Sequence, residues 1–116
     1  MTVSPEIKRA FADLAHGQIH YRTSGSGNPI VLLHASPGSS KQLVSLINGL
    51  SGEMRVISPD TPGNGDSPAL PIETPTIVDL AKAFLSYLDE MRLDRIDLYG
   101  SHTGAAIAVE LAILAR

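Results

Sequence analysis

Short strand-like runs alternate with helix-like segments along most of this chain, and that alternation limits the folds open to it. Residues 30–33 form a continuous apolar run bounded by turn residues, as in a strand buried on both faces of a parallel sheet. The further predicted elements are strands near 30–34, 55–58 and 95–99 and helices near 40–50, 76–91 and 103–115. This order predicts an α/β fold of three layers, with helices on both faces of a mostly parallel sheet and right-handed crossovers.

An antiparallel hairpin is predicted before the parallel part, from strands near 11–15 and 18–23. The second of these strands alternates, so that Ile19 and His20 should lie on opposite faces. His16 and His20 are both expected to be exposed and to bind no ligand.

Composition excludes several classes of protein. The chain has 116 residues, of which 43% are hydrophobic and 18% charged, which fits one globular domain. A net charge of -3 gives no basic surface for nucleic acid. No apolar run reaches the ~18 residues that span a bilayer, and no signal-peptide core is present, so a cytoplasmic protein is expected. With no cysteine and with histidine spacings that match no ligand motif, neither a metal nor a cofactor is expected.

The segment at residues 100–104, Gly-Ser-His-Thr-Gly, lies between a predicted strand and an alanine-rich helix. This is the context of a nucleophile elbow, in which a strained turn with positive φ presents its central residue at the end of a sheet. Glycines on either side let the strand and the helix approach each other closely.

Three segments together resemble the α/β-hydrolase fold family, in the branch of epoxide hydrolases, haloalkane dehalogenases and small esterases. Residues 34–38, His-Ala-Ser-Pro-Gly, resemble the family's oxyanion loop, with Ala35 where Gly is usual. Residues 60–67, Asp-Thr-Pro-Gly-Asn-Gly-Asp-Ser, resemble its Asp-x-x-Gly-x-Gly-x-Ser segment. Residues 100–104 resemble its G-x-S-x-G elbow. The resemblance covers residues 11–116.

The resemblance implies roles for four residues. His102 occupies the nucleophile position, where the family has Ser, Asp or Cys. The backbone N–H groups of Ser36 and Thr103 would form the oxyanion hole. His34 would support the oxyanion loop, and the Ser36–Pro37 peptide bond would be cis. Three roles of His102 remain open: direct nucleophile, general base or polar ligand, and the remnant of a site that has lost hydrolysis.

Asp60 and Asp66 are interpreted as turn-stabilising residues and not as paired catalytic acids. In the family the triad acid and histidine, and the lid, follow the elbow at a distance, so residues 1–116 would be the N-terminal part of a single domain. Strand 95–99 would then have an open edge, and helix 104–115, whose only charged residue is Glu110, would need covering by more of the chain or by a second chain.

The resulting hypothesis is a hydrolase acting on a small organic substrate through an ester or related bond, truncated and inactive as the isolated 116-residue chain. Two alternatives remain. One is a non-catalytic binding or interaction protein on the same fold. The other is a cofactor-free lyase or oxygenase that uses His102 as a base.

Overall fold

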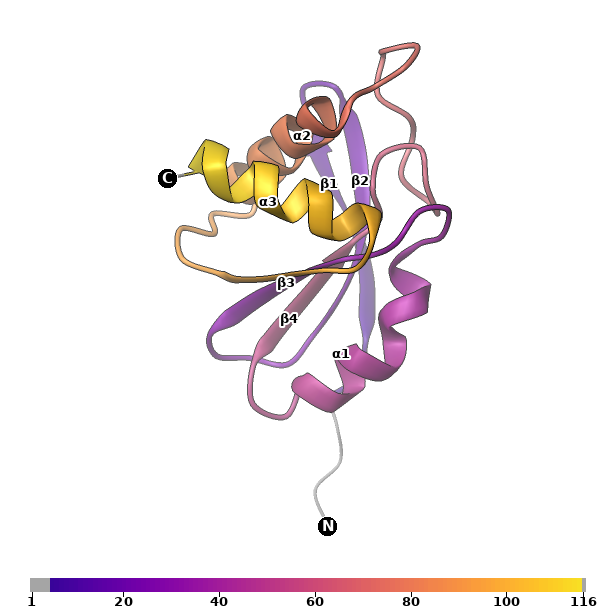
Figure 1. The fold of residues 1–116 in the computed structure, drawn as a ribbon. Helices are drawn as coiled ribbons and strands as arrows, with labels where there is room; N and C mark the ends of the chain where they lie inside the picture. Colours follow the sequence, from indigo (N-terminus) through magenta and orange to yellow (C-terminus); the bar gives the residue numbers. More distant parts are fainter. Residues whose placement is uncertain (1–4, 116) are drawn as a thin grey trace.

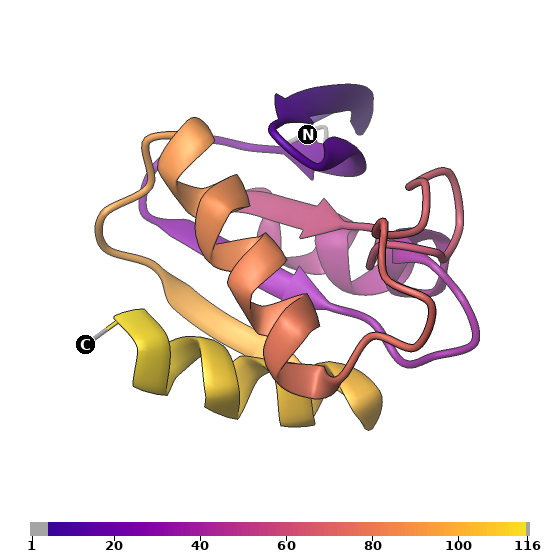
Figure 2. The same ribbon diagram turned by 90° about the horizontal axis from the view of Figure 1, so that it is seen from above.

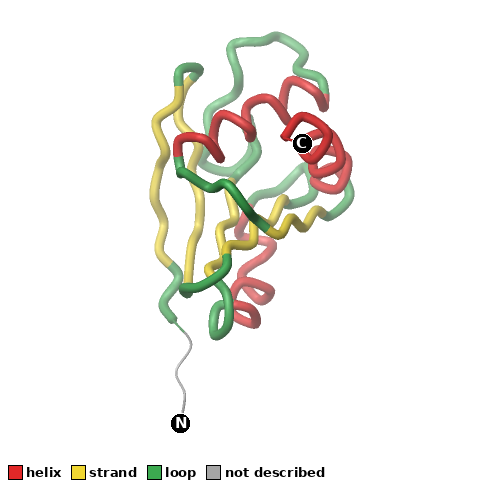
Figure 3. The backbone as a smooth tube through the Cα atoms, turned by 90° about the vertical axis from the view of Figure 1, so that its left-hand side faces the viewer, coloured by secondary structure: helices red, strands yellow, loops and turns green. Residues whose placement is uncertain are grey.

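The computed structural model describes residues 5–115 and has the predicted α/β architecture. Its elements are β1 (Lys8–Leu14), β2 (Gly17–Ser24), β3 (Pro29–Leu33), the 3₁₀ turn η1 (Ser40–Leu43), α1 (Val44–Leu50), β4 (Arg55–Pro59), α2 (Ile77–Glu90), β5 (Asp97–Gly100) and α3 (Thr103–Ala115). Five strands form one sheet in the order β1-β2-β4-β3-β5. Figure 3 shows the long β1–β2 hairpin at one end of this sheet.

The sheet is antiparallel at the hairpin and parallel where the predicted site lies. β1 pairs with β2 and β2 with β4 in antiparallel fashion, whereas β3 pairs in parallel with both β4 and β5. The carboxyl ends of β3, β4 and β5 therefore meet at one edge. The loops that leave them are the three segments that resemble family motifs.

Alternation along the buried strands produces two cores, one on each face of the sheet. Val31 and Leu33 of β3 pack in the cluster that includes Phe84 of α2 and Ile107 of α3. Leu32, between them in sequence, packs with Ile47 of α1 on the opposite face. Figures 1 and 2 show this arrangement, with α1 on one side of the sheet and α2 and α3 on the other. The predicted three layers are confirmed.

Two predicted elements differ in detail. The helix expected over residues 40–50 begins with a 3₁₀ turn, because the Gln42 amide bonds the carbonyl of Ser39 three residues back while the Ser39 side chain caps Lys41. β5 begins at Asp97 and not at residue 95, because its pairing with β3 begins at the pair Ile30 and Asp97.

Helix α3 carries apolar residues on its outer face as well as its inner face. Ile107 and Leu111 are buried, yet Val109 is 60% and Ile113 49% exposed. Within residues 5–115 no strand pairs with the outer edge of β5. The expectation that further polypeptide covers this surface stays a prediction. Among residues 5–115, no helix has the length and apolar character needed to span a bilayer.

Helix α2 begins with a capping box of Thr76 and Asp79, which supports a stability prediction. The Asp79 amide donates to Thr76 Oγ1 over 3.1 Å, and the Thr76 amide donates to Asp79 Oδ2 over 2.9 Å. We expect Thr76→Ala to lower the free energy of unfolding by about 1 kcal/mol, because it removes an acceptor for the first turn. Urea denaturation measures this, with the exposed Thr74→Ala as a control that should change little. Equal losses in both variants would contradict the role of the cap.

Candidate functional site

The elbow, residues 100–104, turns sharply between β5 and α3 as predicted. His102 has a φ of 53°, in the left-handed region. The Ser101 amide donates to the carbonyl of Leu33 over 3.1 Å, which ties the elbow to the end of β3. The Gly104 amide donates to the carbonyl of Ser101 over 2.9 Å and closes the turn. The bend that presents His102 is thus fixed by backbone hydrogen bonds.

Both elbow glycines lie where a side chain would meet backbone. A Cβ built on Gly100 would lie 2.3 Å from the carbonyl oxygen of Gly104. A Cβ on Gly104 would lie 2.2 Å from the carbonyl oxygen of Leu33. Neither neighbour is a flexible side chain that could move aside. The close approach of β3, β5 and α3 at this point therefore requires glycine.

The oxyanion loop begins at His34, which is buried directly after β3. The Thr61 amide donates to His34 Nε2 over 2.9 Å, so this nitrogen accepts and carries no proton. His34 Nδ1 lies 2.8 Å from the carbonyl oxygen of Ala35 and must therefore be the N–H donor. With both nitrogens bonded, His34 is a neutral imidazole that connects the oxyanion loop to the next loop. The Ser36–Pro37 peptide bond is cis.

Asp60 organises the loop that follows β4. Its carboxylate accepts the Ser40 amide at 2.7 Å and the Asp66 amide at 3.0 Å, and it lies 2.8 Å from His20 Nδ1. Burial alone raises the pKa of Asp60, but these hydrogen bonds outweigh it, so the pKa lies below its ordinary value of 3.8. These three contacts bind both oxygens of the buried carboxylate and hold the loop in place. They agree with the interpretation of Asp60 as a turn-stabilising residue.

The expectation that His20 is exposed is wrong. His20 is 1% exposed, because the loop after β4 folds over the polar face of the hairpin. Its Nε2 accepts from Arg9 Nε at 3.0 Å and its amide donates to Ser67 Oγ at 2.9 Å. His20 Nδ1 therefore donates to Asp60. The alternation of β2 predicted which way His20 points but not that a loop covers it. His16 is also partly buried.

A cluster of ligand-type atoms surrounds this histidine, but it suits a guanidinium better than a metal ion. Single ligand atoms of His20, Asp60 and Asp66 lie within 4.8 Å of one another. Arg9 Nη2 pairs with Asp66 at 2.7 Å, while Arg9 Nε uses the free nitrogen of His20. A cation is thus already supplied by the chain, and the group is an ion-pair network that joins the hairpin to the loop after β4.

His102 differs from these histidines in its surroundings. Its side chain is exposed, and within residues 5–115 no hydrogen bond is made to its ring. The amides of Ser36 and Thr103 likewise have no acceptor in the described part of the chain. Thr103 is the first residue of α3, where an amide points out of the helix with the positive end of the dipole. An unbonded imidazole and two unbonded amides therefore flank the end of β3 and β5.

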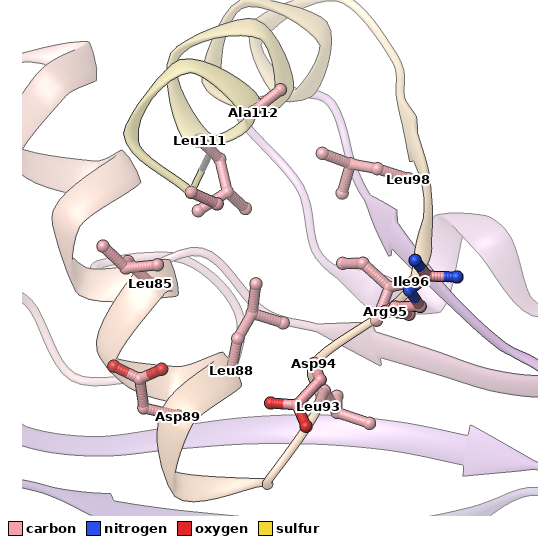
Figure 4. A pocket seen from close by; sticks show the side chains of 11 residues that line it. Leu85, Leu88, Asp89, Leu93, Asp94, Arg95, Ile96, Leu98, Leu111 and Ala112 are labelled. Atoms are coloured by element: carbon pink, nitrogen blue, oxygen red, sulfur yellow. The ribbon is translucent and has the colours of Figure 1, made fainter.

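A pocket within residues 5–115 lies away from the elbow. A pocket of about 590 Å³ opens between α2, α3 and the approach to β5, with Leu85, Leu88 and Leu111 on its walls. Figure 4 shows these leucines facing Leu98, with Asp94 and Arg95 at the side. Arg95 lies before the start of β5, whereas the elbow follows its end. This pocket therefore does not belong to the elbow.

The fold and the elbow define an α/β protein of the nucleophile-elbow class, and comparison with known proteins gives the family. Residues 28–115 match the sequence profile of the alpha/beta hydrolase fold. The chain belongs to the α/β-hydrolase fold family.

Similar proteins include the soluble epoxide hydrolase of Corynebacterium sp. (strain C12), 32% identical over 112 residues, which are 95% of this chain and 38% of that protein. Haloalkane dehalogenase 2 of Mycobacterium tuberculosis (strain ATCC 25618 / H37Rv) is 31% identical over 106 residues, 87% of this chain and 35% of that protein. Among solved structures, the ligand-free epoxide hydrolase CorEH is 31% identical with a TM-score of 0.90, over 96% of this chain and 39% of that one. The chain thus spans less than two-fifths of these relatives.

Proposed function

We propose that the full-length protein is a hydrolase that cleaves a small organic substrate at the carboxyl ends of β3 and β5. The observation that carries this proposal is the elbow, with His102 at a φ of 53° beside two amides that have no acceptor in the described residues. Membership of the α/β-hydrolase fold family supports it, as do relatives named as an epoxide hydrolase and a haloalkane dehalogenase.

The oxyanion hole is assigned to the backbone amides of Ser36 and Thr103. A carbonyl oxygen that becomes negative during attack needs preorganised N–H donors that do not already have acceptors. Thr103 adds the positive end of α3. His34 acts as a positioning residue, because its two bonded nitrogens connect Ala35 of the oxyanion loop to Thr61 of the neighbouring loop. It touches no substrate in this scheme.

His102 is assigned as the group that attacks or deprotonates. A neutral imidazole has a lone pair and needs no partner base to become a nucleophile, unlike a serine hydroxyl. Because the lid that the family places after the elbow would be needed to hold a substrate beside His102, we propose that residues 1–116 alone are inactive. The substrate's identity depends on parts of the pocket that the elbow and its two neighbouring loops do not include.

The second candidate is a non-catalytic ligand-binding protein on the same fold, and one observation favours it. The nucleophile position carries an imidazole and no hydroxyl, thiol or carboxylate. Such a change is expected where hydrolysis has been lost while the binding site remains. In a lyase or oxygenase, the imidazole of His102 would instead be kept because it removes a proton from the substrate.

Substitutions of His102 in the full-length protein separate these candidates. Turnover of esters, epoxides and haloalkanes is measured for the wild type, His102→Ala and His102→Ser. We expect His102→Ala to lose at least about 100-fold in kcat/KM, because it removes the attacking or proton-accepting group. A matched control is His16→Ala, which should keep the activity. If ester hydrolysis appears only in His102→Ser, the non-catalytic alternative is supported and hydrolysis through His102 is contradicted.

A further inference from the structure

We infer that this site accepts activated acyl groups, such as aryl esters and thioesters, and that it does not turn over epoxides or alkyl halides. The inference rests on the proposed function, since it specifies the substrate class of the same site. The relatives are named for reactions on epoxides and haloalkanes, whereas the inferred acyl-transfer reaction follows from the chemistry of one nitrogen nucleophile. The covalent intermediate would be an acyl-imidazole on His102.

The position of the nitrogen follows from the elbow. His102 is exposed at the apex of a bend tied to β3 through the Ser101 amide and the carbonyl of Leu33. Nδ1 lies one bond further from Cβ than a serine hydroxyl would. The imidazole nitrogen therefore reaches further from the turn than a serine hydroxyl at this position would. No carboxylate or imidazole in residues 5–115 bonds this ring, so one nitrogen is available as a free lone pair.

The acyl-transfer step balances with groups already present. The lone pair of the imidazole forms a C–N bond to the acyl carbon, and the carbonyl electron pair moves to oxygen, where the two amides bind it. When the carbonyl re-forms, the C–O or C–S bond breaks and the leaving group departs with that electron pair. The imidazolium releases its proton to water. A second water then attacks the acyl-imidazole, and the products are a carboxylic acid and the neutral imidazole.

The leaving group limits which acyl donors react. The tetrahedral intermediate expels whichever group leaves more readily, and imidazole has a conjugate acid with a pKa of about 6.5. Thiols at about 8.5 and phenols at about 10 compete with it to a useful extent. An alkoxide resembles hydroxide, whose parent water has a pKa of about 15.7, and so returns to the starting ester. Simple alkyl esters are therefore poor substrates for this site.

Epoxides and alkyl halides would inactivate the site by alkylating His102 once. If the nitrogen opens an epoxide or displaces a halide, the product is an N-alkyl imidazole. Its carbon–nitrogen bond has no carbonyl through which water can add and expel the imidazole. His102 would be consumed, and no diol or alcohol would be released. This distinguishes the site from the reactions that the relatives' names describe.

The experiment uses the full-length protein with p-nitrophenyl acetate, ethyl acetate and styrene oxide. We expect multiple turnovers with p-nitrophenyl acetate, preceded by a burst of nitrophenolate, and a transient acetyl group on the peptide that contains His102. Ethyl acetate should react at least about tenfold more slowly. Styrene oxide should give a stable adduct on His102 and no diol. His102→Ala should lose the burst and both adducts, and His16→Ala should keep them.

The outcomes separate this inference from the proposed function. Catalytic diol formation that depends on His102, or His102-dependent turnover of ethyl acetate as fast as that of p-nitrophenyl acetate, would overturn the inference and leave the hydrolase proposal standing. A transient acetyl group on His102 with turnover supports both. A stable acetyl group without turnover supports acyl acceptance and contradicts the hydrolase proposal. No His102-dependent reaction with any of the three compounds would overturn both.

Discussion

Gly104→Ala is expected to lower the free energy of unfolding by about 3 kcal/mol, because an added methyl group has no space at the elbow. Its Cβ would lie 2.2 Å from the carbonyl oxygen of Leu33 and 2.7 Å from that of His34. Both are backbone atoms at the end of β3. The only relief is a shift of α3 away from the sheet, which would separate Ile107 and Leu111 from the core they share with Leu33.

Thermal and urea denaturation of the protein measure this loss, and a fall in Tm of at least about 10 °C is expected. Gly49→Ala is the matched control. Gly49 lies in α1, where an added Cβ meets nothing within 4 Å, so alanine should stabilise the helix by up to about 1 kcal/mol. An elbow variant as stable as the wild type would show that β3 and α3 do not approach as closely as described.

Asp60→Asn is expected to cost about 3–5 kcal/mol, the range for breaking a buried charge network by removing one partner. Asp60 Oδ1 accepts from Ser40, and Oδ2 accepts from both Asp66 and His20. An asparagine amide has one acceptor oxygen, so its NH₂ group would face at least one of these donors. The loop after β4 would then lose contact with the 3₁₀ turn η1 or with the hairpin.

Asp66→Asn is the matched control for this loss. Its carboxylate is 54% exposed, pairs with Arg9 at 2.7 Å and lies 4.0 Å from His20 Nδ1, so its removal should cost less than about 1 kcal/mol. Urea denaturation at pH 7 compares the two variants with the wild type. Equal losses would mean that the network around Asp60 contributes no more than a surface ion pair.

The loss in free energy of unfolding caused by Asp60→Asn should become smaller at acidic pH. The pKa of Asp60 is lowered in the folded chain, so the folded state binds this proton more weakly than the unfolded state. The contribution of Asp60 is therefore complete above its ordinary pKa of 3.8 and is lost as the pH falls through the lower folded value. The gap between wild type and Asp60→Asn should be constant near neutrality and shrink below about pH 4. A gap that widens on acidification would contradict this assignment.

The strands and α-helices of the fold could be predicted from the sequence because they have local signals. Continuous apolar runs such as residues 30–33 indicate buried strands, and the helix expected near residues 76–91 is α2. The position of the elbow followed from glycines between a strand and a helix. The 3₁₀ turn at Ser40 was missed, because it depends on hydrogen bonds to Ser39 that no periodicity reveals.

The surroundings of the site were harder to predict because they depend on residues far apart in the chain. His20 lies in a strand that alternates like a half-exposed one, yet its partner Asp60 is 40 residues away. No local pattern indicates that Arg9 and Asp66 meet beside it. Asp60 was assigned a turn-stabilising role, which the bonds to Ser40 and Asp66 support. No local pattern predicts its bond to His20 of the hairpin.

Leu33 has three roles at once: it ends β3, it precedes the oxyanion loop, and its carbonyl accepts the Ser101 amide of the elbow. Thermal displacement of this end of the strand would carry both loops in the same direction. The spacing between the Ser36 amide and His102 would then vary less than the position of either relative to the distant hairpin. Vibration of the scaffold would leave the alignment of these groups largely intact.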